Sequence, residues 1–276
     1  AGKVDEKSFL GLIDFQISNG TQGILISGTT GESATLSENE KERLFKLTAD
    51  RLKGRIPFIA GTGTNDTKAT LHLSQKAQEV GADALLIITP YYNKPTQQGL
   101  IEHFSYIAKR VTLPIIIYNV PGRTGISIEP STVAELSKIK NIIGIKEATG
   151  SMKQASEIKQ ACPEEFVLLS GDDFTYLPFL SVGGRGIISV SANIIPDKMQ
   201  KIYAEFKAGN LNEALKVHNQ IYDIHKMMFT ETNPIPVKTA LSLMGKINLE
   251  FRLPLCEMKE ENKDKLKEVL KKHKLI

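Results

Sequence analysis

An α/β fold, a (β/α)8 TIM barrel with a C-terminal helical extension, is predicted by three features of the 276-residue sequence. Seven short apolar runs alternate with longer amphipathic stretches over the first two thirds of the chain. Each run is almost continuously hydrophobic, which is typical of a parallel strand covered on both faces. After Ile195 the pattern is helical to the end of the chain.

The predicted strands and the helical segments between them follow one another in units of about 20–35 residues, as right-handed βαβ crossovers require. The strands are 23–27, 56–60, 84–89, 114–119, 142–146, 166–170 and 186–190. A Rossmann-like open sheet is the alternative, but no GxGxxG follows an early strand. The barrel is therefore the favoured interpretation.

Amphipathic patterns predict helices over 5–20, 37–52 and 65–81. The second begins with a Ser-x-x-Glu capping box, formed by Ser37 and Glu40. Beyond Ile195 the helical pattern is interrupted at TNPIPVK (232–238), where two prolines end one helix and start the next. We therefore divide the chain into a barrel, 1–195, and a last barrel helix with the C-terminal helical extension, 196–276.

A closed barrel of this class has eight strands, whereas seven are visible here and the chain opens with a helix. We therefore expect the first strand to be missing from this chain, so that the visible strands are strands 2 to 8. An open barrel would expose two sheet edges. A non-catalytic barrel is accordingly kept as an alternative of a different class.

The composition, 41% apolar and 24% charged, is that of an ordinary soluble protein. Much of the net charge of +4 comes from segment 259–274, which fits a solvated helix face better than a nucleic-acid surface. Cys162 and Cys256 lie far apart, as expected of buried thiols in a reducing compartment. We find no apolar run of membrane-spanning length and no leader, so we expect a cytoplasmic protein that binds neither nucleic acid nor a membrane.

Reactive side chains follow the predicted strands, at the end of a parallel barrel where chemistry gathers. Lys146 ends an otherwise apolar strand, so its amine should be partly desolvated, which disfavours the charged form and favours attack on a carbonyl. An ion pair with a neighbouring carboxylate is equally compatible with this strand alone. Tyr118 ends the preceding strand and could move the protons of Schiff-base formation, although a packed ring is its alternative.

Further candidate groups follow other strands. Thr29 and Thr30 offer hydroxyls beside glycine amides, which suits either a small carboxylate or a plain turn. Arg123 could grip a carboxylate through two hydrogen bonds or simply be a surface side chain. Asp172 and Asp173 could chelate a cation, but capping the next helix is the favoured interpretation. The five histidines lack HxH and HExxH spacing, so no metal site is predicted.

With these segments in order, the sequence resembles the dihydrodipicolinate synthase (4-hydroxy-tetrahydrodipicolinate synthase) family of pyruvate-dependent class I aldolases, from Lys3 to Glu257. The resemblance rests on GTTGES, AGTGTN, ITPYYNKP, YNVPGRTG, GIKEATG, SGDD, GIISVSAN, NPIPVK and RLPL. It implies a homotetramer, a dimer of dimers, without a cofactor or metal. The implied reaction is that of a lyase of the carbon–oxygen class, which condenses pyruvate with aspartate semialdehyde in lysine and diaminopimelate biosynthesis.

The resemblance also implies a role for each catalytic residue. Lys146 forms the covalent Schiff base with pyruvate, and Tyr118 is the central proton-transfer residue. Thr29 and Tyr92 complete a hydroxyl relay, in which Tyr92 reaches in from the neighbouring subunit.

The implied substrate-binding residues are Thr30, Arg123, Gly171 and Ile188. Thr30 holds the pyruvate carboxylate, Arg123 binds the carboxylate of aspartate semialdehyde, and the backbones of the other two line the pocket. N-Acetylneuraminate lyases resemble the chain less, because they carry a serine in the GTTGE loop and no arginine at the position of Arg123. Aldolases that cleave 2-keto-3-deoxy sugar acids share the lysine and the tyrosine and remain the alternative.

Overall fold

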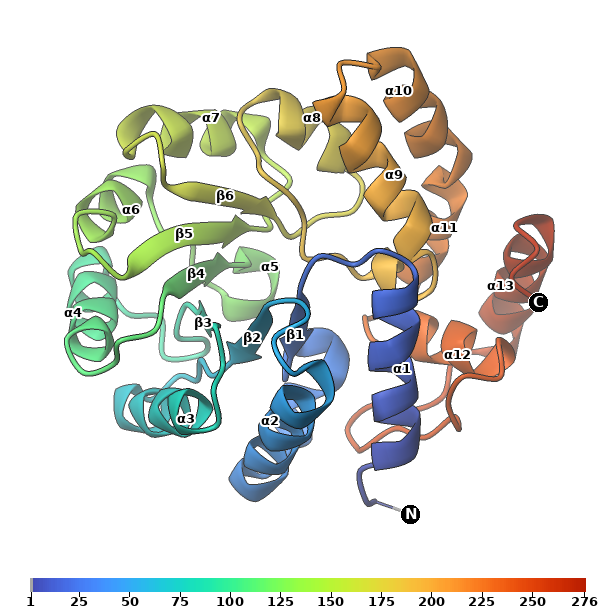
Figure 1. Ribbon diagram of the computed structural model, residues 1–276, viewed down its shortest axis with the longest axis horizontal. Helices are drawn as coiled ribbons and strands as arrows, with labels where there is room; N and C mark the ends of the chain where they lie inside the picture. Colours follow the sequence, from blue (N-terminus) through green and yellow to red (C-terminus); the bar gives the residue numbers. More distant parts are fainter. Residues whose placement is uncertain (1) are drawn as a thin grey trace. The chain divides into compact units, whose positions relative to one another are not determined.

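The computed structural model describes residues 2–276, which form two compact units. One unit takes the chain up to Arg51 and again from Ser189 to Ile276, and the other runs from Leu52 to Ile188. The second unit alternates strands with helices, whereas most of the first is helical (Figure 1). The predicted division at residue 195 stays a prediction.

The second unit is built on parallel strands that lie side by side in chain order. They are β2 (Phe58–Gly61), β3 (Ala84–Ile88), β4 (Ile115–Asn119), β5 (Ile142–Glu147) and β6 (Val167–Ser170). The helices that connect and follow them are α3 (Thr67–Glu79), α4 (Gln97–Ala108), α5 (Pro121–Thr124), α6 (Pro130–Leu136), α7 (Met152–Ala161) and α8 (Tyr176–Ser181). Figure 1 shows α3, α4, α6 and α7 arranged in sequence along one side of these strands.

The strands of this unit have two different faces because successive side chains point to opposite sides. Ile117 of β4 is paired with Ile87 of β3 and Ile145 of β5, and all three are fully buried. This face packs against the helices, whose buried side chains include Leu100, Phe104, Val133 and Ile158. The opposite face carries the alternate positions of the same strands, and there the polar residues of the site are found.

The α/β class and the strands predicted over 56–60, 84–89, 114–119, 142–146 and 166–170 are confirmed within three residues at each end. The strand predicted over 186–190 is wrong, because this segment forms only a single bridge, between Ile187 and Ser170. β6 ends at Ser170, and the amide of Gly171 donates to the carbonyl of Glu147 on β5 instead. The segment therefore pairs with β6 only at Ser170, and the ladder of backbone hydrogen bonds does not continue beyond this residue.

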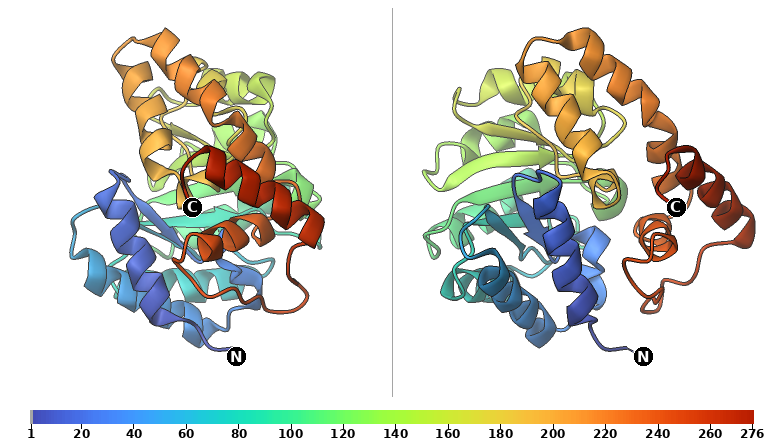
Figure 2. Two further views of the ribbon diagram at one scale, coloured as in Figure 1. Left: turned by 90° about the vertical axis from the view of Figure 1, so that its right-hand side faces the viewer. Right: turned by 45° about the vertical axis from the view of Figure 1, so that its right-hand side comes forward.

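The first unit is mainly helical and begins with α1 (Glu6–Ser18), the short strand β1 (Ile24–Ile26) and α2 (Glu38–Leu52). Two 3₁₀ turns lie between β1 and α2, η1 (Thr29–Gly31) and η2 (Ser33–Thr35), and a third, η3 (Ser191–Asn193), opens its C-terminal part. Five helices follow: α9 (Pro196–Lys207), α10 (Leu211–Gln220), α11 (Tyr222–Met228), α12 (Ile235–Leu243) and α13 (Glu260–Lys272). Figure 2 shows α9 and α10 packed side by side in both views.

The helices expected over 5–20, 37–52 and 65–81 are confirmed as α1, α2 and α3, as is the strand over 23–27, which is β1. The capping box is also present, since the Ser37 amide donates to Glu40 Oε2 (2.9 Å) and the Glu40 amide donates to Ser37 Oγ (3.3 Å). The break at 232–238 separates α11 from α12, with Pro234 at the start of α12.

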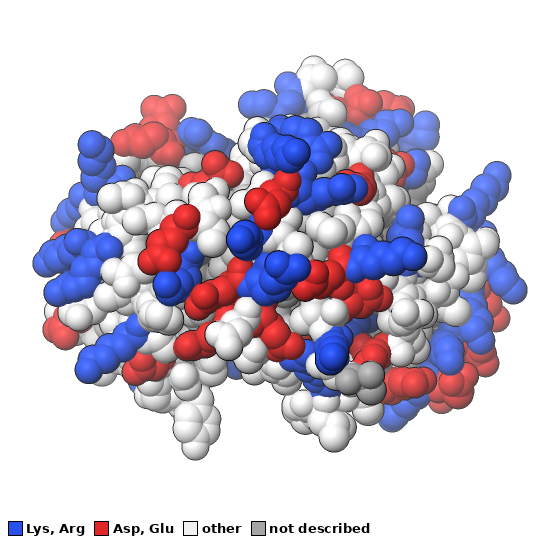
Figure 3. Space-filling model, turned by 60° about the horizontal axis from the view of Figure 1, so that its bottom comes forward, with Lys and Arg blue, Asp and Glu red and all other residues white. Residues whose placement is uncertain are grey.

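Charges of both signs are interspersed on the face drawn in Figure 3. Such mixing differs from the continuous basic surface that nucleic-acid binding requires. Across residues 2–276, no helix is both long enough and apolar enough to cross a membrane.

Candidate active site

Lys146 and Tyr118 are neighbours on paired strands. The register of β4 and β5 places them directly opposite each other, so their side chains leave the same face of the sheet. The Lys146 Nζ lies 4.1 Å from the centroid of the Tyr118 ring. Both side chains are buried, with 8% of each residue's surface exposed. The structure thus brings the predicted nucleophile and the predicted proton-transfer residue into contact.

Burial lowers the pKa of Lys146 from 10.5 to about 8, because the charged amine loses its water. The Asp173 carboxylate opposes this shift, and the positive charge of Arg123 adds to it. With a pKa of about 8, roughly one amine in ten is neutral at pH 7, against roughly one in three thousand at the ordinary value. The fold therefore increases the nucleophilic form of Lys146 by more than two orders of magnitude.

Removing either of the two charges near Lys146 should shift the pH dependence of adduct formation, and the two shifts should have opposite directions. Asp173→Asn removes the charge that raises the pKa of Lys146, so the midpoint of the rate against pH should move below about 8. Arg123→Gln removes the charge that lowers it, so the midpoint should move upward. The measurement is the initial rate of pyruvate adduct formation at each pH. The adduct in every sample is then trapped with borohydride at one fixed pH. Shifts of both variants in the same direction would contradict the electrostatic origin.

Asp173 is a residue of the site that sequence reasoning assigned to a different task. Helix α8 has Thr175 at its N-cap, with no side-chain capping bond, so the predicted capping by Asp172 or Asp173 is wrong. Asp172 instead accepts a hydrogen bond from the Thr175 hydroxyl (2.6 Å), while Asp173 is 1% exposed and acts electrostatically on Lys146. Within residues 2–276, no three His, Cys, Asp or Glu side chains are grouped to hold a metal.

Gly171 lies against the stem of Lys146. A Cβ built on Gly171 would stand 2.9 Å from Lys146 Cε and 2.6 Å from Ala148 Cβ, both closer than side-chain carbons approach. The absence of a side chain at Gly171 is therefore a condition for the observed path of the lysine. The other predicted backbone residue, Ile188, donates its amide to the Ser170 carbonyl (2.9 Å), next to Gly171 at the end of β6.

Arg123 and Tyr92 lie on turns that contact each other. Arg123 is exposed and belongs to α5, which begins at Pro121 and ends before Gly125, a residue in the left-handed region (φ 73°). The amide of Tyr92 donates to the carbonyl of Thr124 in α5 (3.3 Å). Tyr92 itself has a left-handed backbone (φ 73°) and 89% of its surface is exposed. Its side chain thus points away from the packed part of its own unit.

A second buried network supports the site from the opposite face of the sheet, and sequence reasoning did not find it. Glu147 and Asn119 follow Lys146 and Tyr118, and the Asn119 amide donates to Glu147 Oε2 (2.9 Å). The Gln154 side chain of α7 and the Thr149 amide also donate to this carboxylate. Burial raises the pKa of Glu147 in spite of these bonds. Because the network joins the ends of β4 and β5, it restrains the strand ends that carry Lys146 and Tyr118.

Thr29 and Thr30 belong to the other unit and form the 3₁₀ turn η1 together with Gly31. The side chain of Asn233, at the start of the NPIPVK segment, donates from Nδ2 to Thr30 Oγ1 (3.1 Å). Asn233 was not among the predicted site residues, although its segment contributes to the family resemblance. The sequence signal that could have identified it is an asparagine directly before a proline within a segment of the family resemblance, and in the structure this asparagine is 6% exposed.

The structure therefore places the predicted residues in two groups. Six of them lie in the second unit at or beyond the carboxyl ends of its strands: Lys146, Tyr118, Arg123, Gly171, Ile188 and Tyr92. Thr29 and Thr30 lie together in the first unit. The individual roles of these residues stay predictions, and the experiments below address them.

Comparisons with known proteins bear on the chain as a whole. A sequence model of the dihydrodipicolinate synthetase family matches residues 1–273. The 4-hydroxy-tetrahydrodipicolinate synthase of Thermodesulfovibrio yellowstonii is 52% identical over 275 residues, which are 100% of this chain and 94% of that protein.

Two solved structures are similar over nearly the whole chain. The crystal structure of dihydrodipicolinate synthase from Aquifex aeolicus has a TM-score of 0.98 at 47% identity and covers 99% of this chain and 94% of that one. Chloride-inhibited dihydrodipicolinate synthase from Acinetobacter baumannii, complexed with pyruvate, has a TM-score of 0.97 at 43% identity and covers 100% and 94%. The resemblance seen in the sequence is confirmed, and the chain belongs to the dihydrodipicolinate synthetase family.

Proposed function

We propose that this chain is a 4-hydroxy-tetrahydrodipicolinate synthase, which condenses pyruvate with aspartate semialdehyde through a Schiff base on Lys146. One observation carries the proposal: a buried lysine with a pKa of about 8 lies in register with Tyr118 at the strand ends of a member of this family. The pyruvate complex of the Acinetobacter baumannii relative supports pyruvate as the first substrate.

The chemistry follows from the neutral amine. Lys146 Nζ attacks the keto carbon of pyruvate, and loss of water gives an iminium. The iminium withdraws electrons, so a methyl proton is removed and the resulting enamine attacks the aldehyde carbon. The substrate's own amine then replaces Lys146 at the former keto carbon and closes the ring. Tyr118, beside Nζ, is the group that supplies and removes the protons of these steps.

The class of the enzyme follows from the last bond. Ring closure joins carbon to nitrogen, and the activity of the relatives is that of a carbon–nitrogen lyase. The lyase activity implied by the resemblance therefore stands, while its assignment to the carbon–oxygen class is corrected. The product belongs to lysine and diaminopimelate biosynthesis.

The remaining predicted residues are assigned by their chemistry. Thr30 holds the pyruvate carboxylate, Arg123 holds that of aspartate semialdehyde, and the Gly171 and Ile188 backbones line the pocket. Thr29 and Tyr92 complete the hydroxyl relay. The exposure of Tyr92 supports its insertion into a neighbouring subunit, because a tyrosine ring gains free energy from burial.

The finer features of the assembly are part of the same proposal. We assign a homotetramer, a barrel of the (β/α)8 class with a C-terminal helical extension, and a cytoplasmic location. Both cysteines are free, which supports a reducing compartment; Cys162 is buried as expected, whereas Cys256 is exposed, contrary to the expectation. The electron sink is the lysine iminium itself, so the proposed reaction uses no cofactor and no metal.

The test compares two substrate pairs on one preparation. We expect turnover with pyruvate and aspartate semialdehyde, none with 2-keto-3-deoxygluconate, and borohydride trapping of a reduced pyruvyl group on the peptide that contains Lys146. Arg123→Ala should raise the KM for aspartate semialdehyde by about tenfold or more while leaving pyruvate trapping at Lys146 in place. Cleavage of the sugar acid with indifference to Arg123→Ala would favour the aldolase, and an unmodified Lys146 peptide would exclude both.

A further inference from the structure

Two segments of the family resemblance, NPIPVK and RLPL, have no role in the reaction described above. Both lie in the C-terminal part of the first unit, and their side chains meet the loop that carries Thr29 and Thr30. We propose that Lys238 and Arg252 are positioning residues, which hold the Thr29–Gly31 turn in its working conformation by binding Glu32 and Thr35. This inference rests on the proposed function of Thr29 and Thr30.

The local contacts of the turn are few and short in range. η1 is three residues long and is closed by backbone bonds from the Gly31 amide to Gly28 (3.1 Å), the Glu32 amide to Thr29 (3.1 Å) and the Ser33 amide to Gly28 (3.4 Å), with the hydroxyls of Ser27 and Ser33 3.0 Å apart. Ser27 and Glu32, which flank it, have left-handed backbones at φ 60° and φ 54°. L-residues other than glycine enter this region at a cost in free energy, which contacts from elsewhere in the chain help to offset.

Glu32 receives those contacts from both C-terminal segments. Lys238 Nζ donates to Glu32 Oε2 (2.5 Å), and the Arg252 amide donates to Glu32 Oε1 (3.1 Å). The side chains of Lys238 and Glu32 are 20% and 11% exposed, so the ion pair is largely shielded from water. Lys238 is held in turn by the Glu250 carbonyl and by the ring of Phe251. A shielded, multiply bonded pair restricts both partners more than a surface pair does.

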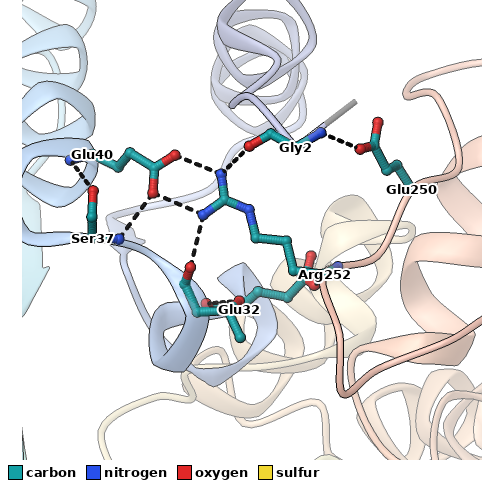
Figure 4. Close-up of polar contacts among 7 residues, drawn as sticks. Gly2, Glu32, Ser37, Glu40, Glu250 and Arg252 are labelled. Atoms are coloured by element: carbon teal, nitrogen blue, oxygen red, sulfur yellow. Dashed lines mark hydrogen bonds and ion pairs between the residues drawn. The ribbon is translucent and has the colours of Figure 1, made fainter.

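The guanidinium of Arg252 holds the chain that follows the turn, at Thr35 and Glu40 (Figure 4). It donates to the Thr35 carbonyl at the end of η2 (2.7 Å) and to both carboxylate oxygens of Glu40 in the first turn of α2. These bonds hold the pKa of Glu40 at about 2, with smaller contributions from Ser37. A further bond reaches the carbonyl of Gly2 (2.7 Å).

Together these contacts restrain the turn at one end and in its middle. Lys238 and Arg252 hold Glu32 and Thr35, two and five residues after Thr30, and Asn233 binds the Thr30 hydroxyl itself. A displacement of Glu32 moves the preceding peptide units because the turn is so short. The C-terminal segments therefore orient the two threonine hydroxyls without contacting the reacting atoms.

A double-mutant cycle tests this positioning. Lys238→Met should raise the KM for pyruvate and lower kcat, each by about tenfold, because a small misplacement of binding groups has large kinetic effects. Thr30→Val removes the group through which Lys238 is proposed to act on pyruvate. In the Thr30→Val background, Lys238→Met should therefore change the KM for pyruvate by less than about threefold. Multiplicative effects of the two substitutions would overturn the proposal.

The controls separate positioning from folding and from the proposed function. Arg43 lies on α2, the helix that also carries Glu40, and pairs with Glu6 of α1 away from η1. Arg43→Met breaks this arginine–carboxylate pair and should leave kcat and KM within about twofold of the wild type. If Lys238→Met does not fold, Arg252→Lys serves instead, since it keeps the charge near Glu40 but cannot make every bond of the guanidinium.

One result would reject the positioning role, and a different one would reject the proposed function. Unchanged kinetics in folded Lys238→Met, or in Arg252→Lys where the first does not fold, would reject it. A wild-type protein that forms no pyruvate adduct at Lys146 would instead reject the proposed function.

Discussion

Lys146→Met is expected to lower kcat by a factor on the order of 10³ or more, because it removes the nucleophile on which every covalent step depends. The borohydride-trapped pyruvyl adduct should disappear from the peptide containing residue 146. Mass spectrometry of the trapped protein and a turnover assay measure the two effects on one sample. Retention of a stoichiometric adduct on another lysine would contradict the assignment.

The same substitution should stabilise the fold at neutral pH. Burial lowers the pKa of Lys146 from 10.5 to about 8, so below about pH 8 folding carries a charged amine into poorly solvated surroundings. This cost is roughly 3 kcal/mol from the size of the shift; it falls as the pH rises from about 8 to 10.5 and is absent above that range. Methionine is never charged, so the variant's gain in free energy of unfolding over the wild type, measured with denaturant, should be greatest below pH 8. A variant that is inactive and also destabilised at pH 7 would point to misfolding instead.

Gly171→Ala is expected to lower kcat by about 10²-fold, because the new methyl group would occupy space used by the stem of Lys146. The clash with Ala148 should also reduce the free energy of unfolding by about 1–3 kcal/mol. Adduct formation should slow in parallel with turnover, since the displaced amine is the attacking group. Pre-steady-state trapping and chemical denaturation measure the two effects.

A glycine in open space is the matched control for this variant. A Cβ on Gly11, in α1, would meet nothing within 4 Å. Gly11→Ala should therefore leave kcat unchanged and stabilise the helix by up to about 1 kcal/mol. Equal kinetic losses in both variants would contradict the steric explanation for Gly171.

Much of the second unit was predictable because its elements have strong local signals. The runs around Ile87, Ile117 and Ile145 are continuously apolar since one face of each strand packs on helices and the other carries further apolar side chains. The strand expected over 186–190 has the same composition but forms a single bridge. Composition reports the propensity for a strand, whereas a strand also needs a partner with a continuing ladder.

The candidate site was predictable to the extent that it lies at strand ends. Lys146 and Tyr118 are the last residues but one of consecutive parallel strands, and their pairing in register follows from that topology. Asp173 and Glu147 were missed because their tasks depend on burial and on partners distant in the chain. The helix-capping assignment of Asp173 failed because α8 begins three residues later, after a turn that the local sequence does not specify.

By itself, the sequence determined the family and the order of most strands and helices, and it supplied the candidate reactive groups, because these depend on local composition and on the spacing of segments. Only the tertiary structure decided which charges tune the pKa of Lys146, why residue 171 is a glycine, and that Lys238 and Arg252 hold the turn of Thr29. Each of these depends on distances between residues far apart in the chain. Such distances are set by packing, which no local pattern encodes.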